Sequence, residues 1–97
     1  TLPEKVTMKS AYTSESDSIG ISWKTVKGAQ GYRVYRYDSA SKKWVKISTV
    51  KSGSTTTFTD KGLDSGTAYK YKVKAYRKAG GKTYTGEASD TKTCKTK

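Results

Sequence analysis

The sequence contains no histidine and no asparagine, and it has one cysteine, Cys94, and one proline. Without histidine, the commonest general base and the commonest neutral metal ligand are missing. A single cysteine excludes an internal disulfide and any metal site built on paired cysteines. Without asparagine there is no N-glycosylation acceptor and no side-chain cross-link between lysine and asparagine. We therefore expect stability to come from packing, and we expect neither an enzyme nor a cofactor.

Hydrophobic residues are also scarce, at 32% of the 97 residues, and none of them form the run of roughly 20 that a membrane span needs. Residues 1–5 lack the apolar stretch of a signal peptide, although this describes the piece and not a longer parent protein. Aromatic residues reach 11%, and eight of them are tyrosines. This length and composition predict one domain over residues 1–97 with a thin, aromatic-rich core.

The formal net charge is +12, large enough to attract polyanions over much of the surface. The simpler explanation is that lysines on exposed strand faces keep a small β-domain soluble and discourage association between sheet edges. Nucleic acid is therefore considered, but it is not the partner we expect.

Apolar and polar residues alternate with period 2 along three segments, the pattern of half-buried strands. In the clearest, 69–76, the core side is predicted to hold Tyr69, Tyr71, Val73 and Ala75, and the solvent side Lys70, Lys72 and Lys74. Segments 19–23 and 32–35 alternate in the same way. Weaker candidates are 6–11, 44–50, 56–59 and 88–95, and turn-forming residues separate them at 27–31, 38–41, 51–54, 64–66 and 79–82. About seven short strands in about 100 residues predict an all-β fold, a seven-stranded antiparallel sandwich of immunoglobulin-like type.

Four segments resemble fibronectin type III domains of the kind found as repeats in bacterial (Firmicutes-like) cell-surface and secreted proteins. They are Ile21-Ser22-Trp23, 26–36 (VKGAQGYRVYR), Phe58-Thr59-Asp60 and 63–75 (LDSGTAYKYKVKA). The resemblance implies that Trp23 is a buried indole between the sheets. It also implies that Tyr69 occupies a tyrosine-corner position, with its hydroxyl bonded to the backbone near Leu63. The expected core consists of Ile21, Trp23, Tyr32, Val34, Phe58, Leu63, Tyr69, Tyr71 and Val73.

The sequence departs from that family's pattern in three places. The turn 64–66 lacks the proline that often precedes its glycine, and the expected loop 77–85 contains no Arg-Gly-Asp, so integrin binding is not implied. The last strand, 88–95, is poor in bulky aliphatic residues. We expect Cys94 there to be a small, half-buried hydrophobic side chain, since no redox motif adjoins it.

A search for catalytic or phosphate-binding motifs gives nothing specific. The eight acidic residues lie mostly in expected turns and strand ends, where capping of backbone amides is their expected role. Serine and threonine are abundant, but no base accompanies them. The glycines in 28–31 and 80–82 do not open a helix, so they indicate turns and not nucleotide-binding loops.

One surface is a candidate for ligand binding. In a sandwich of this topology the strand that holds Lys70, Lys72 and Lys74 pairs with the strand that holds Arg33 and Tyr35, and Trp44 and Lys46 extend the outward face. A basic surface with aromatic residues can bind anionic polymers or glycans. The alternative is an ordinary solvated face, in which lysine alternates with core residues as period 2 requires.

The resemblance implies a non-catalytic spacer or interaction module of a larger extracellular bacterial protein. Its partners would be neighbouring catalytic, carbohydrate-binding or adhesive domains of the same chain, and we expect the module to be a monomer. The alternative function is direct binding of cell-wall or host glycans, or of another anionic polymer, through the basic, aromatic face.

Overall fold

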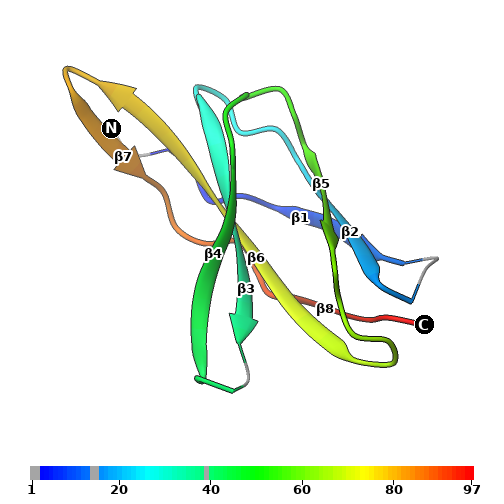
Figure 1. Cartoon of the computed structure of the whole chain (residues 1–97). Helices are drawn as coiled ribbons and strands as arrows, with labels where there is room; N and C mark the ends of the chain where they lie inside the picture. Colours follow the sequence, from blue (N-terminus) through cyan, green and yellow to red (C-terminus); the bar gives the residue numbers. More distant parts are fainter. Residues whose placement is uncertain (1–2, 14–15, 39) are drawn as a thin grey trace.

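A computed structural model describes residues 3–13, 16–38 and 40–97, and its regular structure is entirely β (Figure 1). The strands are β1 (Met8–Tyr12), β2 (Ser18–Trp23), β3 (Gly31–Asp38), β4 (Lys43–Val50), β5 (Thr57–Lys61), β6 (Ala68–Ala79), β7 (Lys82–Thr85) and β8 (Lys92–Lys95). They form two antiparallel sheets, a three-stranded one in the order β1-β2-β5 and a five-stranded one in the order β4-β3-β6-β7, in which β8 also pairs with β6. The predicted all-β, immunoglobulin-like sandwich is confirmed, but the described residues form eight strands where seven were predicted, because β7 lies in the expected loop 77–85.

The core lies between the sheets and follows the predicted alternation. Trp23 of β2 is 1% exposed, and its ring meets that of Tyr32 of β3 edge to face, with centroids 5.4 Å apart. The Tyr32 hydroxyl accepts a hydrogen bond from the amide of Val26 (3.0 Å) and donates one to the carbonyl of Gly53 (2.8 Å). The Tyr32 ring thus fills the core, while its hydroxyl forms hydrogen bonds with backbone groups of two loops.

Seven of the nine residues expected in the core are buried: Ile21, Trp23, Tyr32, Val34, Leu63, Tyr71 and Val73. Phe58 and Tyr69 are only partly buried and pack against this cluster. Phe58 lies on β5, which is an edge strand, and Tyr69 lies near one end of β6. The Tyr69 hydroxyl accepts the amide hydrogen of Asp64 at 2.9 Å, which is the geometry of a tyrosine corner.

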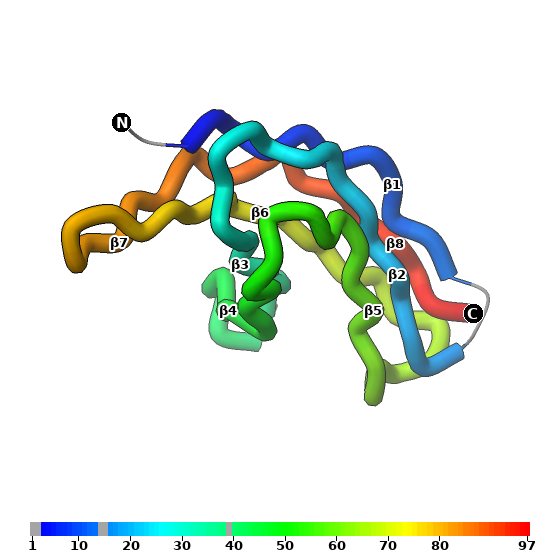
Figure 2. The backbone as a smooth tube through the Cα atoms, turned by 90° about the horizontal axis from the view of Figure 1, so that it is seen from above, coloured from blue at the N-terminus to red at the C-terminus, as the bar shows by residue number. Residues whose placement is uncertain are grey.

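The expected loop 77–85 is instead a β-hairpin, and this prediction was wrong. Gly80 and Gly81 have φ angles of +59° and +80°, the left-handed conformation that a two-residue hairpin turn requires. Therefore β6 continues to Ala79, and β7 returns beside it. The hairpin extends beyond the other strands at one end of the molecule (Figures 1 and 2).

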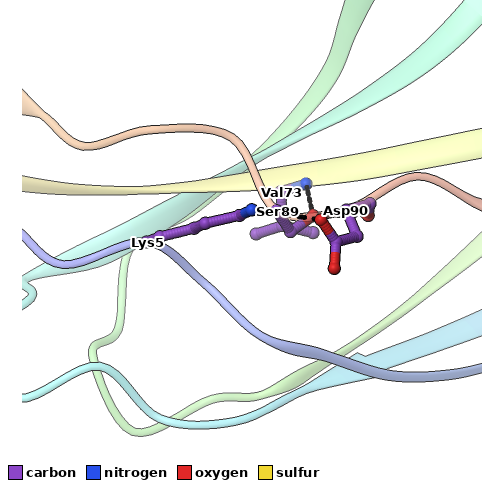
Figure 3. A network of polar contacts seen from close by, with 4 residues as sticks. All are labelled: Lys5, Val73, Ser89 and Asp90. Atoms are coloured by element: carbon purple, nitrogen blue, oxygen red, sulfur yellow. Dashed lines mark hydrogen bonds and ion pairs between the residues drawn. The ribbon is translucent and has the colours of Figure 1, made fainter.

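The expected last strand, 88–95, is regular only over Lys92–Lys95, because the chain leaves the β6 ladder between β7 and β8. Ser89 fills this interruption (Figure 3). Its amide donates to the Val73 carbonyl (2.8 Å), and its hydroxyl accepts the Val73 amide hydrogen (2.9 Å). Beside it, Lys5 forms a 3.0 Å ion pair with Asp90 on the surface. Ser89 thus satisfies both backbone groups of Val73 where regular pairing is lost.

The two ends of the described chain lie far apart along β6. Pro3 adjoins Gly86, whose amide donates to the carbonyl of Ala75, while the carbonyl of Lys97 accepts the amide hydrogen of Gly66 before β6 begins. The molecule is elongated, with extents of 44 × 26 × 19 Å. No helix in the described part of the chain is long and apolar enough to cross a membrane.

Candidate functional site

The seven predicted surface residues share the outward face of the five-stranded sheet, and the structure adds Tyr37 to them. Residue pairing fixes this arrangement: Tyr35 of β3 lies opposite Lys72 of β6 on one side and Lys46 of β4 on the other. We call this surface the basic–aromatic face. Its members are Arg33, Tyr35, Tyr37, Trp44, Lys46, Lys70, Lys72 and Lys74.

Three of the four lysines of this face, those of β6, lie over its aromatic rings. The Lys72 ammonium is 4.3 Å from the centroid of the Trp44 ring and 5.9 Å from that of Tyr35. Lys74 is 5.3 Å from the Tyr35 ring, and Lys70 is 5.6 Å from the Tyr37 ring. The Tyr37 and Trp44 rings meet edge to face at 5.4 Å. These contacts form a cation–π network across three strands.

This network affects what the face can bind. Burial, together with the charge of nearby Lys74, lowers the pKa of Lys72 below its ordinary value. The ring of Trp44 already has an ammonium group over it, so a sugar that stacks on the same side must displace Lys72. The face therefore suits anions, which can bind the lysines from outside, better than neutral sugars.

A second polar cluster lies between the sheets, where sequence reasoning did not place one. Asp60 of β5 is 8% exposed, and one of its oxygens, Oδ2, accepts hydrogen bonds from the Arg36 guanidinium (2.7 Å) and the Tyr71 hydroxyl (2.8 Å). Its role is therefore not the backbone capping that we expected. One feature of the sequence does indicate this position for Arg36. It follows Tyr32 and Val34 with period 2, so its side chain belongs to the inward side of β3.

The environment of this cluster shifts two of its pKa values. Burial and the hydrogen bond to Asp60 raise the pKa of the Tyr71 phenol far above its ordinary value. Burial disfavours the charge of Arg36, but the hydrogen bond and charge of Asp60 outweigh this effect and raise its pKa. The cluster holds a carboxylate, a cation and a phenol in fixed positions, and its hydrogen bonds connect β5 to the opposite sheet at this edge of the core.

Neither the cysteine nor the acidic side chains of the described residues form a reactive or metal-binding site. Cys94 lies opposite Tyr69, is partly buried, and has a pKa that burial raises, so it is packed and not activated. Within residues 3–13, 16–38 and 40–97, no group of three or more cysteine, aspartate or glutamate side chains is arranged to hold a metal ion.

Comparison with known proteins gives a consistent result. The model of the family described as "Fibronectin type III domain" matches residues 3–91. An alpha-amylase from Niallia circulans is 37% identical over 73 residues, which are 72% of this chain but 5% of the amylase. In solved structures, a beta-1,2-glucanase from Parabacteroides distasonis aligns with 99% of this chain and 13% of its own, at TM-score 0.82 and 20% identity. The FN1-FN3 domains of chicken CNTN1 align with 99% of this chain and 30% of theirs, at TM-score 0.68 and 25% identity.

Proposed function

Since the chain belongs to the fibronectin type III domain family, we propose that it is a non-catalytic spacer or interaction module of a larger extracellular bacterial protein. It positions neighbouring catalytic, carbohydrate-binding or adhesive domains, and by itself it is a monomer formed by residues 1–97. The amylase and glucanase relatives support this proposal, because the segments that match this chain are small parts of those proteins.

The observation that carries the proposal is the separation of the two chain ends. Pro3 lies beside Gly86, whose amide is hydrogen-bonded to the carbonyl of Ala75, and the carbonyl of Lys97 is hydrogen-bonded to the amide of Gly66. Gly66 and Ala75 are nine residues apart in the sequence. At about 3.3 Å per residue, these attachment points are roughly 30 Å apart. Neighbours joined at the two ends would be attached at these separated points of a folded sandwich and not directly to each other through a flexible tether.

The ends are also held firmly enough for a spacer. The buried Thr96 hydroxyl accepts the amide hydrogen of Thr67 (3.0 Å) and donates to the carbonyl of Asp64 (2.6 Å), so the last residues are tied to the start of β6. Near the other end, Gly86 has no room for a side chain, because a Cβ there would lie 2.4 Å from the Pro3 carbonyl oxygen.

Pulsed electron spin resonance between labels at positions 4 and 97 tests this role, in a variant that carries Cys94→Ser and cysteines in place of Glu4 and Lys97. We expect one narrow distribution centred at about 30 Å plus the label arms. A flexible chain of the same length would give a broad distribution around roughly 55 Å. A broad distribution in the folded module would refute the spacer role.

A second candidate function is binding of an anionic polymer, such as a charged cell-wall or host glycan, by the basic–aromatic face. The specific observation in its favour is that five cations and three aromatic side chains share one sheet surface, with three of the cations over the rings. Retention on heparin that survives physiological salt would support it, provided that Lys70→Gln/Lys72→Gln/Lys74→Gln abolishes it. The matched control is Lys9→Gln/Lys24→Gln/Lys61→Gln, which removes the same charge elsewhere.

A further inference from the structure

A hollow of about 490 Å³ opens on the outward side of the five-stranded sheet, at the end nearer the β6–β7 hairpin. It is lined by Gln30, Arg33, Lys46, Thr49, Lys51, Tyr76 and Lys78. The lining comes from three neighbouring strands and two adjoining loops, so residues far apart in sequence converge there. Only Arg33 and Lys46 also belong to the basic–aromatic face.

Four of the seven lining residues are cations and none is acidic. Lys46, Lys51 and Lys78 are exposed and form no side-chain hydrogen bond or ion pair within the part of the chain that the structure describes. Like charges that converge without a counterion repel one another, so an anion that enters the hollow relieves this repulsion and gains several contacts at once.

The floor of the hollow is preorganised by contacts between Arg33, Tyr76 and their neighbours. Tyr76 is 6% exposed, and the Arg33 guanidinium lies 5.4 Å from its ring centroid while also reaching Thr85 Oγ1 at 3.5 Å. Gly31 makes room for this ring, because a Cβ there would lie 2.6 Å from the tyrosine hydroxyl. That hydroxyl has no hydrogen-bond partner among the described residues, so it remains available as a donor.

Gln30 contributes a donor of defined orientation. Its side-chain oxygen accepts the amide hydrogen of Lys78 at 2.6 Å, which leaves its NH2 group as the part available to a ligand. The hollow therefore offers a guanidinium, three ammonium groups, a phenol, an amide and the Thr49 hydroxyl. All of them can donate hydrogen bonds, and together they favour an acceptor with several oxygens.

We propose that this hollow binds a doubly charged tetrahedral oxyanion, the phosphate group of a phosphomonoester. The guanidinium of Arg33 and the hydroxyl of Tyr76 contact the oxyanion from the floor, and Lys51 and Lys78 contact it from the rim. The volume beyond the phosphate holds the group that carries it. This inference goes beyond the spacer role and is independent of it.

The test is a titration of the ¹⁵N-labelled domain with inorganic phosphate and, separately, with glucose 6-phosphate, at an ionic strength held constant with NaCl. We expect saturable chemical-shift changes confined to the amides around the hollow. Each exposed charge contact is worth up to about fivefold in affinity, so Lys51→Gln/Lys78→Gln should weaken binding about tenfold. Tighter binding of glucose 6-phosphate would assign the remaining volume to the sugar, and equal binding would assign the hollow to the free ion.

Two controls separate a built site from general attraction to a basic protein. Lys9→Gln/Lys61→Gln removes the same charge from the other sheet and should change the dissociation constant less than twofold. Tyr76→Phe leaves the charge unchanged and should still weaken binding about threefold, the effect of one lost hydrogen bond. Shifts spread over the whole sheet without saturation, or equal weakening by both lysine pairs, would overturn the proposal.

Discussion

Replacing Asp60 with alanine should destabilise the domain strongly, because the change leaves a buried phenol without its partner. The Tyr71 hydroxyl donates to Asp60 at 2.8 Å inside the core, and an unsatisfied buried group of this kind costs about 1–3 kcal/mol. The Arg36 side chain is 32% exposed and can turn to water, so losing its ion pair adds only about 1 kcal/mol. The sum is about 3 kcal/mol.

In a domain of 97 residues this loss corresponds to a fall in Tm of roughly 12–24 °C, which thermal unfolding followed by circular dichroism measures directly. Adding Tyr71→Phe to Asp60→Ala should recover about 1 kcal/mol, since it removes the unsatisfied hydroxyl. The control is Asp90→Ala, whose carboxylate is 85% exposed in its pair with Lys5 and should matter little. If Asp60→Ala melts within a few degrees of the parent, or if Tyr71→Phe gives no recovery, the cluster is not stabilising in the way its geometry indicates.

Three further predictions follow from the fold. Trp23→Ala should lower the free energy of unfolding by about 3–5 kcal/mol in a denaturant titration, since it removes a large ring that is 1% exposed; a loss under 1 kcal/mol would contradict its central place in the core. Because the pKa of Tyr71 is raised in the folded state, the contribution of this residue to the free energy of unfolding is constant below pH 10 and should fall by about 1.4 kcal/mol per pH unit as the pH rises above 10. This alkaline slope should be shallower in Tyr71→Phe, and identical slopes would count against the shift. Gly81→Ala places a side chain at φ +80° and should loosen the hairpin by about 1 kcal/mol, seen as faster hydrogen exchange in β7 with little change in Tm.

Much of the sandwich could be predicted from the sequence because alternation with period 2 identifies which side of a strand is buried. The pattern around Trp23, Tyr32 and Val73 gave both the strands and most of the core. Pairing between neighbouring strands then brought Tyr35, Lys46 and Lys72 onto one surface. These are consequences of strand geometry, and they need no knowledge of individual contacts.

The remaining features depend on distant contacts or local turn chemistry. The Gly80-Gly81 pair indicates a turn, but a turn alone does not tell how far the flanking strands continue, so the sequence predicts a loop where the structure has a hairpin. The alternation along β6 places Tyr76 on the outward side of the sheet. Tyr76 is nevertheless buried, because Arg33 covers its ring and Gly31 leaves room for it. The burial of Asp60 depends on Arg36 and Tyr71, two residues of the other sheet, which no pattern within β5 indicates.

The most direct test of the scaffold role is a binding screen of the isolated domain against neutral glycans, heparin, teichoic-acid-like polymers and single-stranded DNA at low and physiological salt. At about 0.01 M salt, charges act over roughly 30 Å, and at 0.15 M over about 8 Å. The predicted result is retention by anionic polymers at low salt only, with no neutral glycan bound. Binding of a glycan that survives physiological salt would contradict the spacer role, and its loss in Lys70→Gln/Lys72→Gln/Lys74→Gln would assign it to the basic–aromatic face.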